Sequence, residues 1–147
     1  MNAGTVAGTN TAAGVEKAVP FLGVTDMETS LRYYIDGLGF EMTNKWVVDG
    51  RVRWCWLECG GASLMLQEFL KDRVPAGKLG EGVHVCFMCK DAVAIYREVK
   101  ARGIQARRRP FVGNGLWVTG LTDPDGYMIE FESPTDAPEE SEYLDPA

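Results

Sequence analysis

The stretch VHVCFMCKDAVAIYREV, residues 83–99, decides how this chain folds. Its first six residues form an apolar run of strand-like pattern, and Asp91 then stands where the N-cap of a helix is expected. Apolar residues follow at the i, i+3, i+4, i+7 spacing of one buried helix face: Ala92, Ile95, Tyr96 and Val99. The pattern predicts a strand followed directly by a helix that ends at Gly103.

The same order occurs earlier in the chain. Residues 19–24, VPFLGV, are strand-like, and Thr25-x-x-Glu28 forms a predicted capping box. A second buried helix face follows: Leu31, Tyr34, Ile35 and Leu38. Gly37 and Gly39 are expected to end this helix. Strand-like runs then follow each helix, at 40–48, 51–58 and 62–69 and again at 104–112, 115–121 and 127–131.

The two halves repeat with a shift of 65 residues. The shift places Asp26 on Asp91 and Val19 on His84. A strand–helix–three-strand unit used twice predicts an α+β fold of two βαβββ modules, at about 17–70 and 80–134. Residues 17–134 would form one domain, after a flexible leader (1–16) and before an acidic, solvated tail (135–147). Tyr143 and Leu144 offer the alternative of attaching that tail to the surface.

Composition limits the classes of partner. The formal net charge of −6 and the pI near 4.8 disfavour nucleic acid and anionic membranes. No run approaches the roughly 20 apolar residues of a membrane span, and the amino terminus lacks the pattern of a signal peptide. A cytoplasmic location is therefore expected. The basic cluster Arg107–Arg109, followed by Pro110, is typical of a solvated strand edge.

The four cysteines do not predict a zinc site. Cys86 and Cys89 form a C-x-x-C pair, but in an alternating strand their side chains project to opposite faces. Cys55 and Cys59 share a face but would stand about 13 Å apart. We expect all four to be reduced and to behave as small apolar residues.

Two segments resemble the vicinal oxygen chelate superfamily, which includes glyoxalase I, the bleomycin- and fosfomycin-resistance proteins and the extradiol dioxygenases. They are FLGVTDMETSLRYYIDGLGFEM, residues 21–42, and GLTDPDGYMIEFES, residues 120–133. The resemblance implies paired modules whose strands curl into a cup-shaped, barrel-like mixed sheet, usually in a homodimer. It says little about activity, because this scaffold carries isomerases, transferases, oxygenases and pure binding proteins.

The resemblance also implies a metal-ligand pattern, a histidine on the first strand and a glutamate on the last strand of a module. His84 and Glu130 match this pattern in the second module. The corresponding positions of the first module hold Val19 and Met65, or Leu66 if one turn is shorter. A zinc, manganese, nickel or iron ion would therefore need a further ligand, from the substrate or from a tyrosine such as Tyr127.

The remaining candidates are residues that would line the cup and bind a ligand: Val19, Phe21, Trp54, Trp56, Met65, Trp117 and Met128. Trp54 and Trp56 share one strand face, with Trp46 across the Asp49–Gly50 hairpin, and they form either core or a flat apolar wall. Arg51 and Arg53 should lie on the opposite face.

Three functions follow from these residues. The favoured one is a small organic molecule-binding protein without a complete metal site and without a cofactor. The first alternative is a divalent-metal-dependent lyase, isomerase, transferase or dioxygenase that uses His84 and Glu130 as metal ligands. The second is a metal-free enzyme in which His84 and Glu130 are the catalytic pair for acid–base chemistry.

Overall fold

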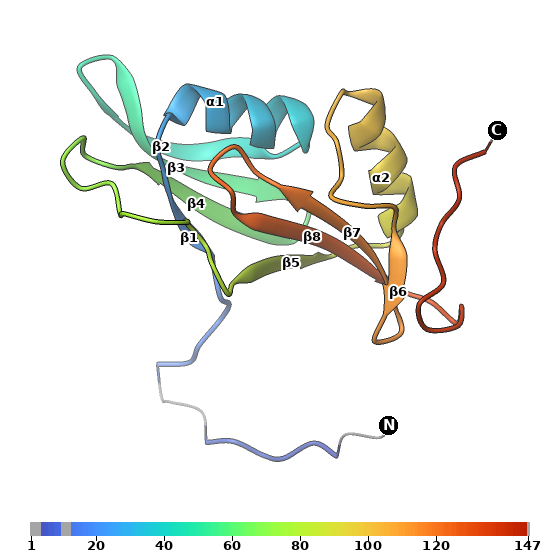
Figure 1. Cartoon of the computed structure of the whole chain (residues 1–147). Helices are drawn as coiled ribbons and strands as arrows, with labels where there is room; N and C mark the ends of the chain where they lie inside the picture. Colours follow the sequence, from blue (N-terminus) through green and yellow to red (C-terminus); the bar gives the residue numbers. More distant parts are fainter. Residues whose placement is uncertain (1–3, 10–12, 147) are drawn as a thin grey trace.

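The computed structural model describes residues 4–9 and 13–146, and Figure 1 shows how the elements are arranged. The first half contains β1 (Phe21–Val24), α1 (Met27–Leu31), the π-helix η1 (Arg32–Gly37), β2 (Glu41–Val48), β3 (Arg51–Cys59) and β4 (Ala62–Glu68). The second half contains β5 (His84–Met88), α2 (Ala92–Ala101), β6 (Phe111–Gly113), β7 (Leu116–Thr122) and β8 (Met128–Pro134). The element order confirms two βαβββ modules.

The described strands form two mixed sheets with the same topology. Sheet A has the order β1-β4-β3-β2 and sheet B the order β5-β8-β7-β6. In sheet A, Phe21 lies opposite Met65, and in sheet B, Cys86 lies opposite Glu130. Both members of the second pair follow their counterparts by 65 residues, so the repeat seen in the sequence holds at the level of strand register. Met65, rather than Leu66, is thus the counterpart of Glu130.

Each helix begins at an aspartate. The side chains of Asp26 and Asp91 accept hydrogen bonds from the backbone N–H of Thr29 and Ala94. The predicted capping box was therefore displaced by one residue: Thr25 is not the cap, and its hydroxyl binds Asp125 instead. Gly39 adopts the left-handed backbone conformation after the first helical segment, as Gly103 does after α2.

A polar residue near the end of the last strand also binds each helix start. Glu68 accepts the backbone N–H of Met27 at 2.9 Å, and Ser133 accepts that of Ala92 at 2.9 Å. The four residues occupy equivalent positions in the two modules. Glu68 carries a charge where Ser133 does not, and Arg53 pairs with it at 2.7 Å.

The helices cover one face of the sheets, and this covered face holds the core. Contacts join α1 to β4 and α2 to β7 and β8. A chain of ring contacts runs through the core from Tyr34 to Phe40, Phe87 and Phe131 and so joins the two modules. The Tyr34 hydroxyl also donates to Asp123 of the second module at 2.7 Å.

The acidic tail docks on the domain, contrary to the solvated tail that was expected. Tyr143 donates its backbone N–H to the Pro110 carbonyl at 2.8 Å, and Glu142 forms a β-bridge with Phe111. Leu144 remains exposed, so tyrosine and backbone contacts attach the tail and leucine does not.

The structure also bears on the predicted strand over 104–112, the predicted leader and the predicted absence of a membrane span. The strand expected over 104–112 is reduced to β6, because Pro110 has no N–H to donate and the residues before it form bends. Leader residues 4–9 and 13–16 are exposed, and the rest of the predicted leader lies outside the described residues. Within the described part of the chain, the helices are too short and polar to cross a bilayer.

Candidate functional site

The face of sheet A that the helices leave uncovered is lined with aromatic residues. Across the strands, Phe21 lies beside Met65, and Met65 lies beside Trp56. In the next row, Trp54 lies directly opposite Trp46. Phe21 and Trp46 are each 55% exposed, although side chains of this size are normally buried. These five residues are called the aromatic face below.

A hollow of about 480 Å³ opens at one end of the aromatic face. Phe21, Trp46 and Phe69 supply apolar walls, and the charged lining residues are Arg73 and the ion pair of Arg53 with Glu68. The tip of the Phe69 ring can approach β1 here because Gly23 has no side chain: a Cβ at Gly23 would stand 2.1 Å from Phe69 Cζ. The hollow can therefore hold a flat apolar group beside a negatively charged one.

Sheet B brings the two predicted catalytic residues together. His84 Nδ1 lies 2.7 Å from Glu130 Oε1, and the two residues stand on neighbouring strands. Since an ionised carboxylate only accepts hydrogen bonds, the contact places a proton on Nδ1 and leaves Nε2 of the neutral ring as an acceptor. The His84 side chain is 50% exposed, whereas that of Glu130 is only 11% exposed. The His84 ring therefore lies between the buried carboxylate of Glu130 and solvent.

Arg107 forms the third part of this group. Its Nη2 donates to Glu130 Oε1 at 2.8 Å, the oxygen that also faces His84. Its Nη1 donates to the Leu121 carbonyl, and its backbone N–H donates to the Gly120 carbonyl at 2.9 Å. The prediction that the basic cluster is a solvated strand edge is wrong for Arg107, because a buried carboxylate draws its guanidinium inward.

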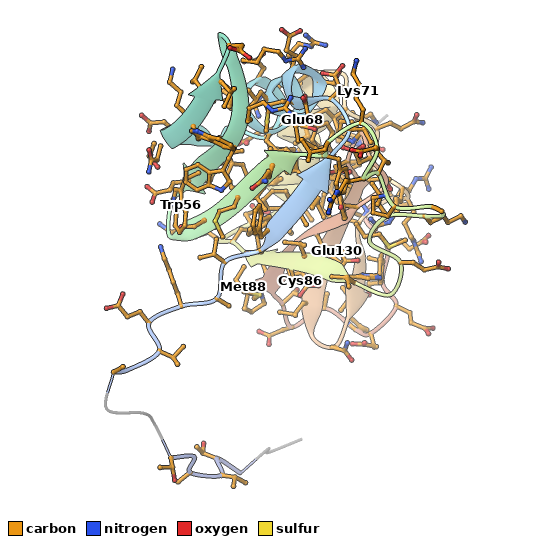
Figure 2. The ribbon with its side chains drawn as sticks, turned by 90° about the vertical axis from the view of Figure 1, so that its left-hand side faces the viewer. Trp56, Glu68, Lys71, Cys86, Met88 and Glu130 are labelled. Atoms are coloured by element: carbon orange, nitrogen blue, oxygen red, sulfur yellow. The ribbon has the colours of Figure 1, made fainter. Side chains whose placement is uncertain are left out.

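Cys86 and Glu132 complete the polar surroundings of Glu130. The Cys86 thiol donates to Glu130 Oε2 at 3.6 Å, and one ligand atom from each of Cys86, Glu130 and Glu132 lies within 4.8 Å of the other two. Figure 2 shows Cys86 and Glu130 together on sheet B, with Trp56 on the other sheet.

The pKa values of the two carboxyl groups in this cluster, Glu130 and Glu132, are shifted in opposite directions. Burial alone would raise the pKa of Glu130, but the hydrogen bond and charge of His84 and the hydrogen bond of Cys86 outweigh it, so the pKa is lowered. Burial and the hydrogen bond and charge of Glu130 raise the pKa of Glu132. Burial, aided by the two carboxylates, raises the pKa of the Cys86 thiol to about 11. Glu130 is therefore the carboxyl group of the cluster that ionises more readily, and it lies beside a neutral thiol.

This donor set does not fit a resident divalent ion. A catalytic metal site generally uses three protein ligands and an open position, each ligand in its deprotonated form. Here the guanidinium of Arg107 already binds the Glu130 oxygen that faces His84, so a cationic group occupies the position beside the buried carboxylate. Tyr127 supplies no ligand either, because its hydroxyl donates to the Gly23 carbonyl at 2.8 Å.

The other predicted residues are divided between the faces. Met128 lies opposite His84, on the face that carries Glu130. Val19 is half-buried just before β1. The structure does not bring Trp117 to this face: it pairs with Ser133, whose hydroxyl binds the start of α2, and so it lies on the side of the helix.

Several site residues escaped the sequence analysis. Arg107, Glu132, Phe69 and Arg73 were not proposed, and Cys86 was regarded as a small apolar residue. One signal was present in the sequence: Gly120 interrupts an otherwise bulky strand, which often marks the close approach of another group. A Cβ at Gly120 would stand 2.5 Å from Arg107 Nη2.

Comparison with known families gives a match over most of the chain. The model of the family described as Glyoxalase/Bleomycin resistance protein/Dioxygenase superfamily matches residues 15–131. A search of curated proteins gave no match.

Solved structures share the fold at low sequence identity. TioX from Micromonospora sp. ML1 has a TM-score of 0.66 at 19% identity, with 82% of this chain and 100% of that chain covered. TnmS3, an antibiotic binding protein from Streptomyces sp. CB03234, has a TM-score of 0.63 at 21% identity, with 82% and 98% covered. A bleomycin resistance determinant encoded on the transposon Tn5 has a TM-score of 0.64 at 22% identity, also with 82% and 98% covered.

Proposed function

Because the chain belongs to the Glyoxalase/Bleomycin resistance protein/Dioxygenase superfamily, we propose that it binds a small, planar organic molecule on the aromatic face of sheet A, without a resident metal. The observation that carries the proposal is the exposure of that face. Phe21 and Trp46 remain uncovered beside a hollow of about 480 Å³, and such apolar surface on a sheet usually marks a binding site.

The charges at the hollow indicate which molecules would fit. Arg53 and Arg73 border the aromatic walls, so a flat ring system that carries an acidic group would match both features. Arg53 is also anchored to Glu68 at 2.7 Å, which keeps its guanidinium in place before a ligand arrives. TnmS3, a neighbour of the same fold, is an antibiotic binding protein, which supports a search among antibiotics.

Fluorescence titration tests the proposal. We expect the anionic dye 8-anilinonaphthalene-1-sulfonate, and at least one member of a panel of planar aromatic antibiotics with bleomycin included, to bind saturably and quench tryptophan emission. Trp46→Ala and Phe21→Ala should each weaken dye binding by about 1 kcal/mol, roughly fivefold. Leu144→Ala, which removes an exposed apolar side chain on the tail, is the matched control. Equal affinities in all four proteins would remove the aromatic face from the binding site.

Dimerisation is part of the same proposal. Val47 and Val48 of the edge strand β2 are both exposed, and an apolar edge strand is a liability for a monomer unless a partner covers it. We expect a homodimer in solution, measurable by sedimentation equilibrium. Val47→Lys should shift the protein toward monomer, whereas the same change at Val74, an exposed loop residue, should not.

The His84–Glu130 contact favours acid–base catalysis as a second candidate function. A ring nitrogen held by a buried carboxylate leaves Nε2 free to accept a proton from a bound carbon acid or hydroxyl. Any turnover found in a substrate screen should fall by about 100-fold or more in His84→Gln. Turnover that survives this change, or that requires added metal, would contradict the metal-free mechanism.

A further inference from the structure

The second module contains a cation position that the chain fills itself. Glu130 is a buried carboxylate, and it needs a compensating positive charge or hydrogen bonds in order to remain ionised. His84 and the permanently charged guanidinium of Arg107 both contact the same oxygen, Oε1. We propose that the guanidinium of Arg107 takes the place of a metal ion here, so that Arg107 excludes divalent metals from the His84–Cys86–Glu130–Glu132 cluster.

The backbone holds the guanidinium at this point. Nη1 donates to the Leu121 carbonyl, and the backbone N–H of Arg107 donates to the Gly120 carbonyl, so both the guanidinium and the backbone of this residue are bound to β7. The Arg107 side chain is only 27% exposed, in contrast to the 53% of Arg108, which pairs with Glu142 of the tail. Arg107 is thus the member of the basic cluster that is placed inside the site.

Gly120 makes room for the guanidinium. It lies opposite Glu130 in the ladder, and a Cβ at this position would stand 2.5 Å from Arg107 Nη2 and 2.9 Å from Cζ. Both atoms belong to the far end of a flexible side chain, so an added methyl group would displace them without disrupting the strand. The backbone of Gly120 is also not in the left-handed region, so alanine is compatible with it.

Removal of the guanidinium would leave three donors close together, on Cys86, Glu130 and Glu132, with His84 in contact with Glu130. Glu130 Oε1 lies 2.7 Å from His84 Nδ1, and Cys86 and Glu132 offer ligand atoms within 4.8 Å of Glu130. A set of imidazole, thiolate and carboxylate ligands suits Zn²⁺ and Co²⁺. The arginine, rather than a shortage of donors in the second module, is therefore what keeps these ions out.

The test compares metal binding among folded variants. Calorimetric titration with ZnCl₂ should show no stoichiometric binding to the wild type. Arg107→Met should bind one Zn²⁺ at least about tenfold more tightly than the wild type, and Gly120→Ala should gain affinity in the same direction. Arg107→Lys, which keeps the positive charge, should remain close to the wild type. Arg109→Met and Gly61→Ala are the matched controls, since an alanine at Gly61 meets open space.

A second measurement locates the ion. Co²⁺ added to Arg107→Met should give visible absorption bands that include a thiolate-to-metal transition, and Cys86→Ser or Glu130→Gln in that background should abolish them. Stoichiometric Zn²⁺ in the wild type that is lost in Glu130→Gln would overturn the proposal. It would also be overturned if Arg107→Met and Gly120→Ala fold but bind Zn²⁺ no better than the wild type. If Arg107→Met does not fold, Gly120→Ala decides the outcome alone. Organic-ligand binding plays no part in this readout, so variants that gain no Zn²⁺ affinity leave the proposed function standing, whereas stoichiometric Zn²⁺ in the wild type would also contradict its metal-free part.

Discussion

At the scale of single residues, the pair Glu68 and Ser133 shows how one position serves two purposes. Both accept the first backbone N–H of a helix, but only Glu68 also binds two arginines, Arg51 and Arg53, at 3.2 and 2.7 Å. Its side chain is almost completely buried, so the carboxylate depends on these partners. The charge of Glu68 therefore helps to hold Arg53 at the wall of the hollow beside the aromatic face.

We expect Glu68→Ala to lower the free energy of unfolding by about 2–3 kcal/mol. The change leaves the Met27 N–H without its acceptor and releases Arg53 from the wall of the hollow. Ser133→Ala, which removes one neutral hydrogen bond at the equivalent position, should have an effect of about 1 kcal/mol. Urea unfolding of the three proteins measures the difference, and equal losses in the two variants would refute a special role for the charge.

His84 allows a direct test of the site geometry, because it is the single histidine of the chain. Its ring nitrogens therefore give the only imidazole signals in a long-range proton–nitrogen correlation spectrum. With Glu130 as acceptor, the neutral ring should carry its proton on Nδ1, and this preference should weaken in Glu130→Gln. A neutral ring protonated on Nε2 in the wild type would show that the contact with Glu130 is absent in solution.

At the scale of elements, the tail changes the exposed edge of sheet B. β6 is an edge strand, and unpaired strand edges promote association between chains. Val112 donates to the Ser141 carbonyl at 2.9 Å and accepts from Glu140 at 2.9 Å, so the tail covers part of that edge. Asp145 continues the attachment to α2, with 3.0 Å to the Tyr96 hydroxyl.

Deletion of residues 139–147 should therefore lower the free energy of unfolding by about 1–2 kcal/mol and increase aggregation on heating. Deletion of residues 1–14 is the control. Of the residues that it removes, those that the structure describes (4–9, 13 and 14) are exposed, and the deletion stops before Lys17, whose ammonium lies over the Trp56 ring and binds Ser63. The control should shift the melting temperature by no more than about 2 °C. Equal effects of the two deletions in thermal unfolding would contradict the docked tail.

At the scale of the whole molecule, the two modules depend on polar contacts as well as on the shared core. The Tyr34 hydroxyl reaches Asp123, the Tyr127 hydroxyl reaches the Gly23 carbonyl, and Arg102 donates to the Gly37 carbonyl at 2.9 Å. Each of these contacts joins one module to the other. Asp123 is the only ionisable acceptor among the three, and burial raises its pKa in the folded protein despite the hydrogen bonds from Tyr34, Tyr127 and Asp125.

The raised pKa gives a pH dependence of defined sign. Folded Asp123 binds a proton more readily than unfolded Asp123, so its contribution to stability is complete below the ordinary aspartate pKa and is lost as the pH rises through the higher folded value. In that window the wild type should lose stability relative to Asp123→Asn, with a slope of at most about 1.4 kcal/mol per pH unit. Urea unfolding of both proteins from pH 4 to pH 7 measures this difference, with Asp136→Asn as the control. A difference that is flat or of opposite slope would contradict the prediction.

The sequence alone determined the elements, the repeat and the two principal residues of sheet B. Helix periodicity, strand alternation and the shift of 65 residues depend only on local spacing, and they identify His84 and Glu130, which lie on one face of neighbouring strands, two residues apart in register. The same alternation predicted the shared face of Trp54 and Trp56, and the hairpin predicted Trp46 on the strand across from them, but a register shift between Trp46 and Val47 is what places Trp46 opposite Trp54. These properties follow from one strand, one helix or one turn at a time.

The tertiary structure alone decided what surrounds those residues. Arg107 lies in a bend outside any regular element, so no periodicity indicates where its side chain goes; a buried carboxylate and the space over Gly120 direct it inward. The position of the tail is likewise decided by a distant segment, because the tail pairs with the open edge of β6. Trp117 lies on the helix side, since the register of β7 against β8 settles the face of every residue in that strand. Contacts of this kind depend on segments distant in sequence, so they become visible only when the chain has folded.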